Sequence, residues 1–396
     1  MKILFLTTVL PIRARSGGEI VSQKIIDELL LNNWKVDVIG YTREIESGYE
    51  KPVNYFSAGV RIIETKSNKK QTFLWLINAF IKKNALSVQK YIDRNYIDLT
   101  LRKIEQNKYA YIFIDHTQML WILDFLPTDV RVVLISHNVE SELYRTLSED
   151  ASGWVKTKLL VRESLHISRL EKDNISKIDQ VWALSESDKS FYENLIATID
   201  RNNAKCIKFD ALPVLTPDLD SNKKIEYDIS ILGTWTWDAN MQGLQWFFEK
   251  VYPLLSQKIS IHVAGKGADW LAEKFPNVTY RGFVNDAHDF MVASRLILIP
   301  SIAGAGVQIK TLDAITVGRP IIATNFALRG LEDYPSYVHA VDQPTKMAEI
   351  VNSVIKSSYS SEYISLCTKE STSWYYRKKD KFKKMISENL EIRVGE

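Results

Sequence analysis

Short apolar runs alternate with longer amphipathic stretches along the first half of the chain. The clearest helix covers residues 19–31, where Val21, Ile25, Ile26 and Leu29 fall on one side. Such alternation is typical of a mostly parallel sheet whose two faces are covered by helices. The apolar runs predict buried strands at residues 3–8, 36–41, 111–115, 130–136 and 180–184.

The second half of the chain repeats this plan. Residues 240–255 are expected to form a helix with Leu244, Phe247 and Leu254 on one apolar stripe. Between the two halves, residues 212–224 are rich in Pro, Asp, Ser and Asn, which suits an interdomain linker. The apolar runs here predict strands at residues 227–232, 260–264, 278–280, 296–300 and 321–324.

The length of the chain sets the expected number of domains. At 396 residues it exceeds one comfortable hydrophobic core, so we expect two domains, at residues 1–215 and 225–374. The predicted fold is α/β, with two doubly wound Rossmann-like domains facing each other across a central cleft. Residues 375–396 are strongly basic and predict an amphipathic terminal helix, which we expect to pack back on the first domain.

Composition excludes several classes of protein. The net charge is only +3 and no nucleic-acid-binding motif accompanies the basic tail, so we expect no nucleic-acid partner. Cys206 and Cys367 match no metal or disulfide spacing, and the six histidines form no zinc-type cluster, so no metal is expected. The first apolar run is too short for a signal peptide, and no run is long enough to span a bilayer. A cytoplasmic protein is therefore expected.

A glycine loop between two buried strands carries the strongest chemical signal. Residues 304–306 follow the strand at 296–300 and open a helix that ends at Gly318. Glycines let the backbone approach a ligand, and the free N–H groups and dipole of a helix N-terminus favour a phosphate. The alternative is an ordinary strand–helix–strand unit with a glycine turn. The residues expected to bind a phosphate or nucleotide here are Gly304, Ala305, Gly306, Val307, Gln308, Lys310, Thr311 and Asp313.

A second set of polar residues follows strands of the first half. Gly17 and Gly18 open the first helix after a buried strand, and Glu19 is expected to be a capping residue or a carboxylate on the acceptor side. His116 and His137 each come directly after a predicted strand. A lone histidine is usually structural, but two histidines at equivalent strand ends favour ligand contact, because these ends face the crevice of such sheets.

At this point the chain resembles the retaining glycosyltransferases of the glycosyltransferase-B fold, family 4. The similarity runs over most of the chain, through pieces that are weak singly but fairly specific in their order and spacing. It is carried by residues 16–19, 137–145, 183–188, 282–286, 304–320 and 324–331.

The resemblance implies a role for each piece. The second domain would bind a nucleotide-diphosphate sugar, with Phe283 and Val284 holding the base through backbone groups. The helix after Gly306 would receive the diphosphate, and Asp313 would bind the ribose hydroxyls. His116 would touch the donor sugar. The remaining donor contacts expected are Gly17, Gly18, His137, Gly233 and Thr234, and the residues expected to act in catalysis are His116, Lys310 and Glu19.

The chain departs from the family pattern at the phosphate site. The usual pair of glutamates eight positions apart stands here as Ala305 and Asp313, and the usual Arg and Lys fall at Thr234 and Ala239. Lys310 is expected to replace that positive charge, because a diphosphate needs compensation. The resemblance implies retention of configuration without a metal or other cofactor, and an acceptor that is a glycan or lipid-linked glycan, in surface polysaccharide biosynthesis.

Other functions remain open from the sequence. A sugar-nucleotide epimerase of the same fold needs several carboxylates and histidines around the sugar, and few are present. A non-catalytic subunit that binds a sugar nucleotide is suggested by Ala305. A nicotinamide oxidoreductase is disfavoured, because no Gly-x-Gly-x-x-Gly follows the first strand.

Residues 72–83 form an apolar segment that ends in a lysine pair, with Lys66, Lys69 and Lys70 just before it. One interpretation is a helix that lies in an anionic lipid surface, which would place the protein peripherally at the inner membrane face. The favoured alternative is a helix that packs in the core or lines the acceptor side of the cleft.

Overall fold

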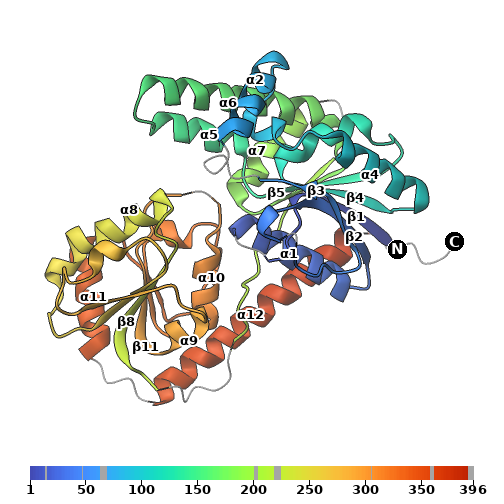
Figure 1. Ribbon diagram of the computed structural model, residues 1–396. Coiled ribbons are helices and arrows are strands. Elements are labelled where there is room, and N and C mark those ends of the chain that lie inside the picture. The colour runs from blue at the N-terminus through green and yellow to red at the C-terminus, as the bar shows by residue number, and fades with distance from the viewer. Residues whose placement is uncertain are drawn as a thin grey trace. The chain divides into compact units, whose positions relative to one another are not determined.

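A computed structural model describes residues 1–13, 16–46, 48–62, 69–199, 204–217, 224–304, 306–356 and 361–390. The chain forms two compact units, each built around a parallel sheet (Figure 1). The first unit contains residues 1–209 together with the chain from Met385 on, and the second contains residues 210–384. Of the expected features, the two Rossmann-like α/β units are confirmed, whereas the cleft between them stays a prediction.

The sheet of the first unit has the strand order β3-β2-β1-β4-β5-β6-β7, with every neighbouring pair parallel. The order reverses between β1 and β4, so their carboxyl ends form the crevice where such sheets bind ligands. Its strands are β1 Lys2–Val9, β2 Lys35–Thr42, β3 Tyr55–Val60, β4 Tyr111–Asp115, β5 Arg131–Ser136, β6 Gln180–Ala183 and β7 Lys205–Lys208.

Helices cover both faces of this sheet (Figure 1). One face carries a large apolar core that includes Leu6, Tyr96, Ile114 and Ile167. Helix α1 lies on the opposite face (Figure 1). The helices are α1 Gly17–Leu31, α2 Lys69–Ile81, α3 Leu86–Gln89, α4 Arg94–Gln106, α5 Glu140–Glu149, α6 Trp154–Asn174 and α7 Glu186–Ala197, with 3₁₀ turns at Glu44–Glu46, Thr117–Phe125 and Ile175–Lys177.

The sheet of the second unit has the order β10-β9-β8-β11-β12-β13, again entirely parallel. Its reversal point lies between β8 and β11, and α8 and α11 cover one face while α9 and α10 cover the other (Figure 1). The strands are β8 Tyr227–Leu232, β9 Ile261–Ala264, β10 Val278–Gly282, β11 Ser294–Ile299, β12 Ile321–Ala323 and β13 Val338–Ala340. The helices are α8 Asp238–Trp246, α9 Ala287–Val292, α10 Ile309–Thr316, α11 Pro344–Lys356 and α12 Ser361–Asn389, with short turns at Phe247–Val251, Tyr252–Leu254, Asp269–Leu271 and Asn325–Leu328.

The helix expected at residues 240–255 is not continuous. The α-helical part ends at Trp246, a π turn follows over Phe247–Val251, and a 3₁₀ turn ends at Leu254. Pro253 lies in that last turn, where it cannot donate a helical hydrogen bond. Leu254 is consequently exposed, although the apolar stripe predicted that it would be buried.

The unit boundaries differ from the expected ones at both points where the chain passes from one unit to the other. Val214 and Leu215 belong to the second unit, where their N–H groups donate to Asp313 Oδ1 at 2.6 and 3.0 Å. The basic helix begins at Ser361, and its residues up to Lys384 also belong to the second unit. Lys378 explains the second difference, because its buried ammonium group pairs with Asp210 of the same unit.

Candidate functional site

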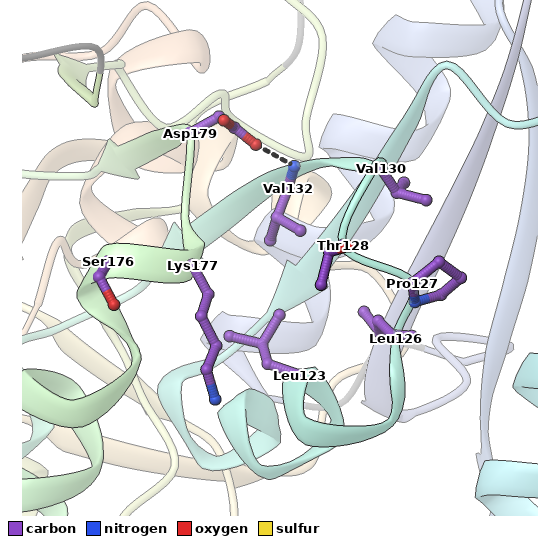
Figure 2. Close-up of a pocket in the computed structure, with 9 residues that line it drawn as sticks. All are labelled: Leu123, Leu126, Pro127, Thr128, Val130, Val132, Ser176, Lys177 and Asp179. Carbon is purple, nitrogen blue, oxygen red and sulfur yellow. Dashed lines mark hydrogen bonds between the residues drawn. The ribbon is translucent and has the colours of Figure 1, made fainter. Parts of the chain in front are cut away.

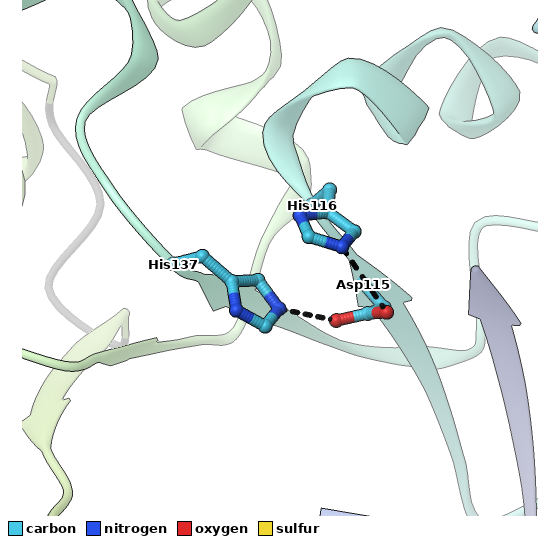
Figure 3. A group of neighbouring side chains, drawn as sticks. All are labelled: Asp115, His116 and His137. Carbon is cyan, nitrogen blue, oxygen red and sulfur yellow. Dashed lines mark hydrogen bonds and ion pairs between the residues drawn. The ribbon is translucent and has the colours of Figure 1, made fainter. Parts of the chain in front are cut away.

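The side chain of Asp115 organises the carboxyl edge of the first sheet. It lies at the end of β4 and is completely buried. Thr7 and Ser22 donate to its Oδ2 at 2.6 and 2.7 Å, and His137 Nε2 lies 2.7 Å from its Oδ1 (Figure 3). Strands β1, β4 and β5 and helix α1 thus meet at one carboxylate, at the point where the strand order reverses.

The structure brings His116 and His137 together, as predicted from their places at strand ends. Their rings stack with centroids 4.0 Å apart, and His116 Nε2 lies 3.7 Å from Asp115 Oδ2 (Figure 3). A Cβ atom on Gly18 would come within 3.0 Å of the His116 ring and 3.9 Å of His137 Nδ1. The glycine therefore lets helix α1 begin directly against both imidazoles.

The backbone of His116 is in an uncommon conformation. Its φ of 74° and ψ of 136° lie in a region that L-residues with a side chain avoid. Such strain costs on the order of 1–3 kcal/mol and is characteristic of functional sites. The observation supports a functional role for His116.

Burial and neighbouring side chains set the protonation states of His116 and Asp115. Burial, and then the neighbouring His137, lower the pKa of His116 to about 4, so its imidazole is neutral near pH 7. Burial disfavours the charged form of Asp115, but the adjacent histidines and the hydrogen bonds from His137 and Thr7 outweigh it and lower its pKa to about 2. The ionised Asp115 accepts a hydrogen bond from His137 Nε2–H, and in the neutral imidazole this tautomer leaves Nδ1 as an acceptor. This buried Nδ1 has no hydrogen-bond partner in the described chain.

Asp115, His116 and His137 place their ligand atoms within 4.8 Å of one another, close enough to be considered as a metal site. The contacts between them are those of a hydrogen-bonded group, since His137 and both hydroxyls already engage the carboxylate. The arrangement is therefore explained by hydrogen bonding within the chain.

Glu19 has the environment of a capping residue. Its N–H donates to the Ser16 hydroxyl at the helix N-terminus, and Ser16 Oγ donates back to Glu19 Oε1 at 2.8 Å. Arg43 binds both carboxylate oxygens, at 2.6 and 2.9 Å. The capping role expected for Glu19 is thus visible, whereas its catalytic role stays a prediction.

In the second unit, the glycine loop leads into helix α10, the segment predicted to bind an anion, and that binding stays a prediction. Gly304 and Gly306 have φ angles of 125° and 64°, which favour glycine. The N-cap residue of α10, Gln308, makes no side-chain capping bond, and its Oε1 is buried without a partner in the described chain. Ala305 lies outside the described residues. The helix end therefore offers backbone N–H groups that no side chain caps.

Two cations lie together at this helix end. Lys310 Nζ donates to Asn240 Oδ1 at 2.9 Å, and Asn240 donates to the Thr234 carbonyl at 3.0 Å, so α10 is joined to the turn after β8. Arg329 also reaches the loop, because a Cβ atom on Gly304 would lie 3.5 Å from its guanidinium.

These cations affect each other. Burial, and then the charge of Arg329, lower the pKa of Lys310 to about 8, and burial lowers the pKa of Arg329 to about 10. No carboxylate of the described chain forms an ion pair with either side chain. Two partly buried cations without an acidic partner destabilise each other, and a bound anion would remove that repulsion.

The other predicted donor contacts of this unit are distributed as follows. The turns after β8, β9 and β10 are hydrogen-bonded to one another, through Gly233 N to Ala264 O and Gly265 N to Gly282 O. Phe283 is 68% exposed at this edge, and Val284 is half-buried. Thr311 is buried and donates to the Ala327 carbonyl at 3.0 Å.

The remaining predicted residues of the second unit are Val307 and Asp313. Val307 packs against Gly330, where an added Cβ atom would come within 2.6 Å of its Cγ2. Asp313 holds the backbone of residues 214 and 215 through its Oδ1. Its binding of a ribose stays a prediction.

A hollow of about 290 Å³ lies in the first unit, away from these residues (Figure 2). Val130 and Val132 line it at the start of β5, and Asp179 lines it just before β6. Asp179 accepts a hydrogen bond from Val132 N at 2.7 Å (Figure 2). This hollow lies at the amino ends of the strands, opposite the edge that carries Asp115, and no predicted site residue lines it.

Comparison with known proteins gives a family match in the second unit. Residues 226–357 match the family described as Glycosyl transferases group 1. The second unit is similar to the group 1 glycosyltransferases over most of its length. The matched segment spans the glycine loop, Lys310, Arg329 and the turn after β10.

Solved structures of similar shape agree with the glycosyltransferase-B fold of the whole chain. Sucrose-phosphate synthase from Thermosynechococcus elongatus is 13% identical, with a TM-score of 0.66 over 98% of this chain and 97% of that chain. WaaG, a glycosyltransferase involved in lipopolysaccharide biosynthesis, is 15% identical, with a TM-score of 0.59 over 97% of this chain and 99% of its own. HepE from Anabaena, solved with UDP and glucose, is 12% identical, with a TM-score of 0.58 over 98% of this chain and 99% of its own.

One curated relative resembles this glycosyltransferase-B chain in sequence. It is an uncharacterized 44.6 kDa protein in the cps region of Klebsiella pneumoniae, 22% identical over 347 residues. The alignment covers 83% of this chain and 84% of the relative. Among the helices that the structure describes, none is long and apolar enough to cross a membrane.

The sequence analysis missed several residues of the site, among them Asp115, Arg329 and Asn240. Asp115 directly precedes His116 at a strand end, and that position was the available signal. Arg329 lies within the segment 324–331 that carries the family resemblance. Asn240 had no signal in the sequence, because its bond to Lys310 exists only in the folded unit.

Proposed function

We propose that the protein transfers a sugar from a nucleotide-diphosphate sugar to a hydroxyl group of a glycan or lipid-linked glycan, with retention of configuration. The observation that carries the proposal is the pair Lys310 and Arg329 at an uncapped, glycine-opened helix end of the unit that is similar to the group 1 glycosyltransferases. A diphosphate supplies the negative charge that these cations lack.

A role in polysaccharide biosynthesis is supported by two of the similar proteins. One lies in a cps region, and WaaG is a glycosyltransferase of lipopolysaccharide biosynthesis. HepE was solved with UDP and glucose, which supports a nucleotide-diphosphate sugar as the donor class. We place such a reaction at the cytoplasmic side, where nucleotide sugars are the activated donors.

Each group has a physical role in the proposed reaction. Lys310, Arg329 and the backbone N–H groups of α10 stabilise the charge that develops on the leaving diphosphate. In the first unit, neutral His116 can donate a hydrogen bond to the donor sugar or accept one from it, and Gly18 lets the start of helix α1 lie against the His116 ring. His137 is a positioning residue, because Asp115 fixes its Nε2 and its stacked ring supports His116.

The proposal is tested by incubating the protein with a panel of sugar nucleotides, with and without a membrane-derived glycolipid fraction as acceptor. We expect one donor to release its nucleoside diphosphate, faster with acceptor present. Conversion of the donor into an isomer would instead favour an epimerase. Donor binding without release under any condition would favour a non-catalytic subunit.

A further inference from the structure

Helix α2 exposes a stripe of apolar side chains that runs from Phe73 to Ile81. Trp75 and Ala79 are buried and fasten the helix to the first unit. The side chains on the outer side are spaced three and four residues apart and therefore form one stripe. They are Phe73, Leu74, Ile77, Phe80 and Ile81, and between 40 and 73% of each is exposed. Burial in the core, one form of the favoured alternative for this helix, is thus wrong for the stripe, whereas lining of the acceptor side of the cleft stays a prediction.

Helix α6 continues this apolar surface. Arg162 donates to the Ala79 carbonyl at 2.8 Å, and its guanidinium lies 4.2 Å from the centre of the Phe80 ring. Val155 and Leu159 lie seven and three residues before Arg162, so they share its side of the helix. Both are exposed, as is Trp154 at the helix start. The stripe on α2 and these residues are here called the α2/α6 surface.

Helix α2 is held firmly in this position. Arg162 caps its last turn, and Glu163 accepts hydrogen bonds from the N–H groups of Leu86 and Ser87, at 2.7 and 3.1 Å, in the segment that follows. The exposed apolar side chains therefore belong to a docked helix with a fixed outer face.

The charged residues of the two segments that carry this surface are all positive. Residues 69–83 and 153–162 contain no Asp or Glu. Lys70, Lys82, Lys83 and Lys158 are exposed, and none forms an ion pair in the described chain. Lys158 lies 5.2 Å from the centre of the exposed Trp154 ring, a pairing that suits the headgroup level of a bilayer.

We propose that the α2/α6 surface binds the headgroup region of an anionic membrane. Apolar side chains ringed by lysines match such a surface, because the apolar groups enter the acyl boundary and the lysines meet lipid phosphates. A protein partner fits less well, since lysine is depleted in protein interfaces. The proposal is independent of the transferase activity.

Vesicle sedimentation of the full chain tests this proposal without any donor or acceptor. We expect binding to an equal mixture of phosphatidylcholine and phosphatidylglycerol at low salt, weaker binding at high salt, and little binding to phosphatidylcholine alone. Lys70→Gln with Lys82→Gln should weaken binding about 25-fold, since each lysine near an anionic surface contributes about fivefold. Lys250→Gln with Lys258→Gln in the second unit is the matched control.

The apolar half of the surface needs its own variants. Phe73→Ser with Ile77→Ser should reduce binding by at least about tenfold. Val53→Ser with Leu366→Ser removes equally exposed apolar groups elsewhere and should change nothing. Circular dichroism checks that each variant is folded.

Two results would overturn the proposal. One is equal failure to bind neutral and anionic vesicles at low salt. The other is concentration-dependent self-association that Phe73→Ser with Ile77→Ser abolishes while vesicle binding stays unchanged, because the surface would then be covered by a second copy of the chain.

Discussion

Lys310 donates a 2.9 Å hydrogen bond to Asn240, and this contact joins the helix opened by the glycine loop to the turn after the first strand of the second unit. The bond fixes the position of the ammonium group but does not neutralise it. A cation held in place without an acidic partner is prepared for an anionic ligand, so no side chain must rearrange when a diphosphate arrives.

Replacement of Lys310 tests whether its ammonium group binds the diphosphate. Lys310→Ala should lose about 2–3 kcal/mol of transition-state stabilisation, because a charge-assisted hydrogen bond to the diphosphate is removed. The measurement is kcat/KM for the donor. Lys346→Ala, an exposed lysine paired with Glu349 in the same unit, is the control. Wild-type catalytic efficiency in Lys310→Ala would remove this role.

Donor affinity should depend on pH near the pKa of Lys310. Burial and Arg329 lower its pKa to about 8, so the side chain is charged below that pH and loses its charge above it. A diphosphate binds the charged form, and donor affinity should therefore fall as the pH rises above 8, by up to about tenfold per unit. Titration calorimetry across this range measures the slope. In Lys310→Ala the slope should disappear; a slope that persists there would assign the titration to another group.

His116 offers a test that separates function from stability. Glycine adopts its backbone conformation without strain, so His116→Gly should recover on the order of 1–3 kcal/mol that offsets the loss of the stacked ring. We expect a melting temperature close to that of the wild type and a transfer rate at least tenfold lower. Asn33→Gly, at an exposed residue with a φ of 64°, controls for the general effect of such a change. A large drop in melting temperature with activity retained would show that His116 is structural.

Asp313 has a visible structural role and a predicted one. In Asp313→Asn the amide oxygen can still accept from the N–H groups of Val214 and Leu215, while the negative charge is lost. If the carboxylate also binds the ribose, the donor KM should rise tenfold or more with kcat nearly unchanged. A lower melting temperature with an unchanged KM would leave only the role of holding the linker.

The sequence pattern predicted the two parallel sheets, because their central strands are buried on both faces and therefore appear as continuous apolar runs. Strands β3, β7 and β13 were missed, since they lie at sheet edges, are only partly buried and do not form such runs. The helix at 240–255 was predicted as one piece, because helical periodicity does not reveal where Pro253 and the π turn interrupt it.

The candidate site was predictable where one local segment carries it. The glycine loop and Lys310 lie close together in the chain, and each histidine directly follows a strand. Partners that are distant in sequence could not be found this way. Asp115 accepts hydrogen bonds from Thr7, Ser22 and His137 only after β1, β4 and β5 pair. The lowered pKa of Lys310 likewise depends on burial and on Arg329, and both arise only in the folded unit.

The central claim is that Lys310 and Arg329 bind the diphosphate of a nucleotide sugar. Titration calorimetry of the wild type and of Lys310→Ala with Arg329→Ala, using a panel of nucleoside diphosphates, tests it most directly. We expect at least one nucleoside diphosphate to bind the wild type, and the double variant to bind it at least about a hundredfold more weakly, since two charge-assisted contacts are lost. Equal affinity in the two proteins, or no binding of any nucleoside diphosphate to the wild type, would contradict the claim.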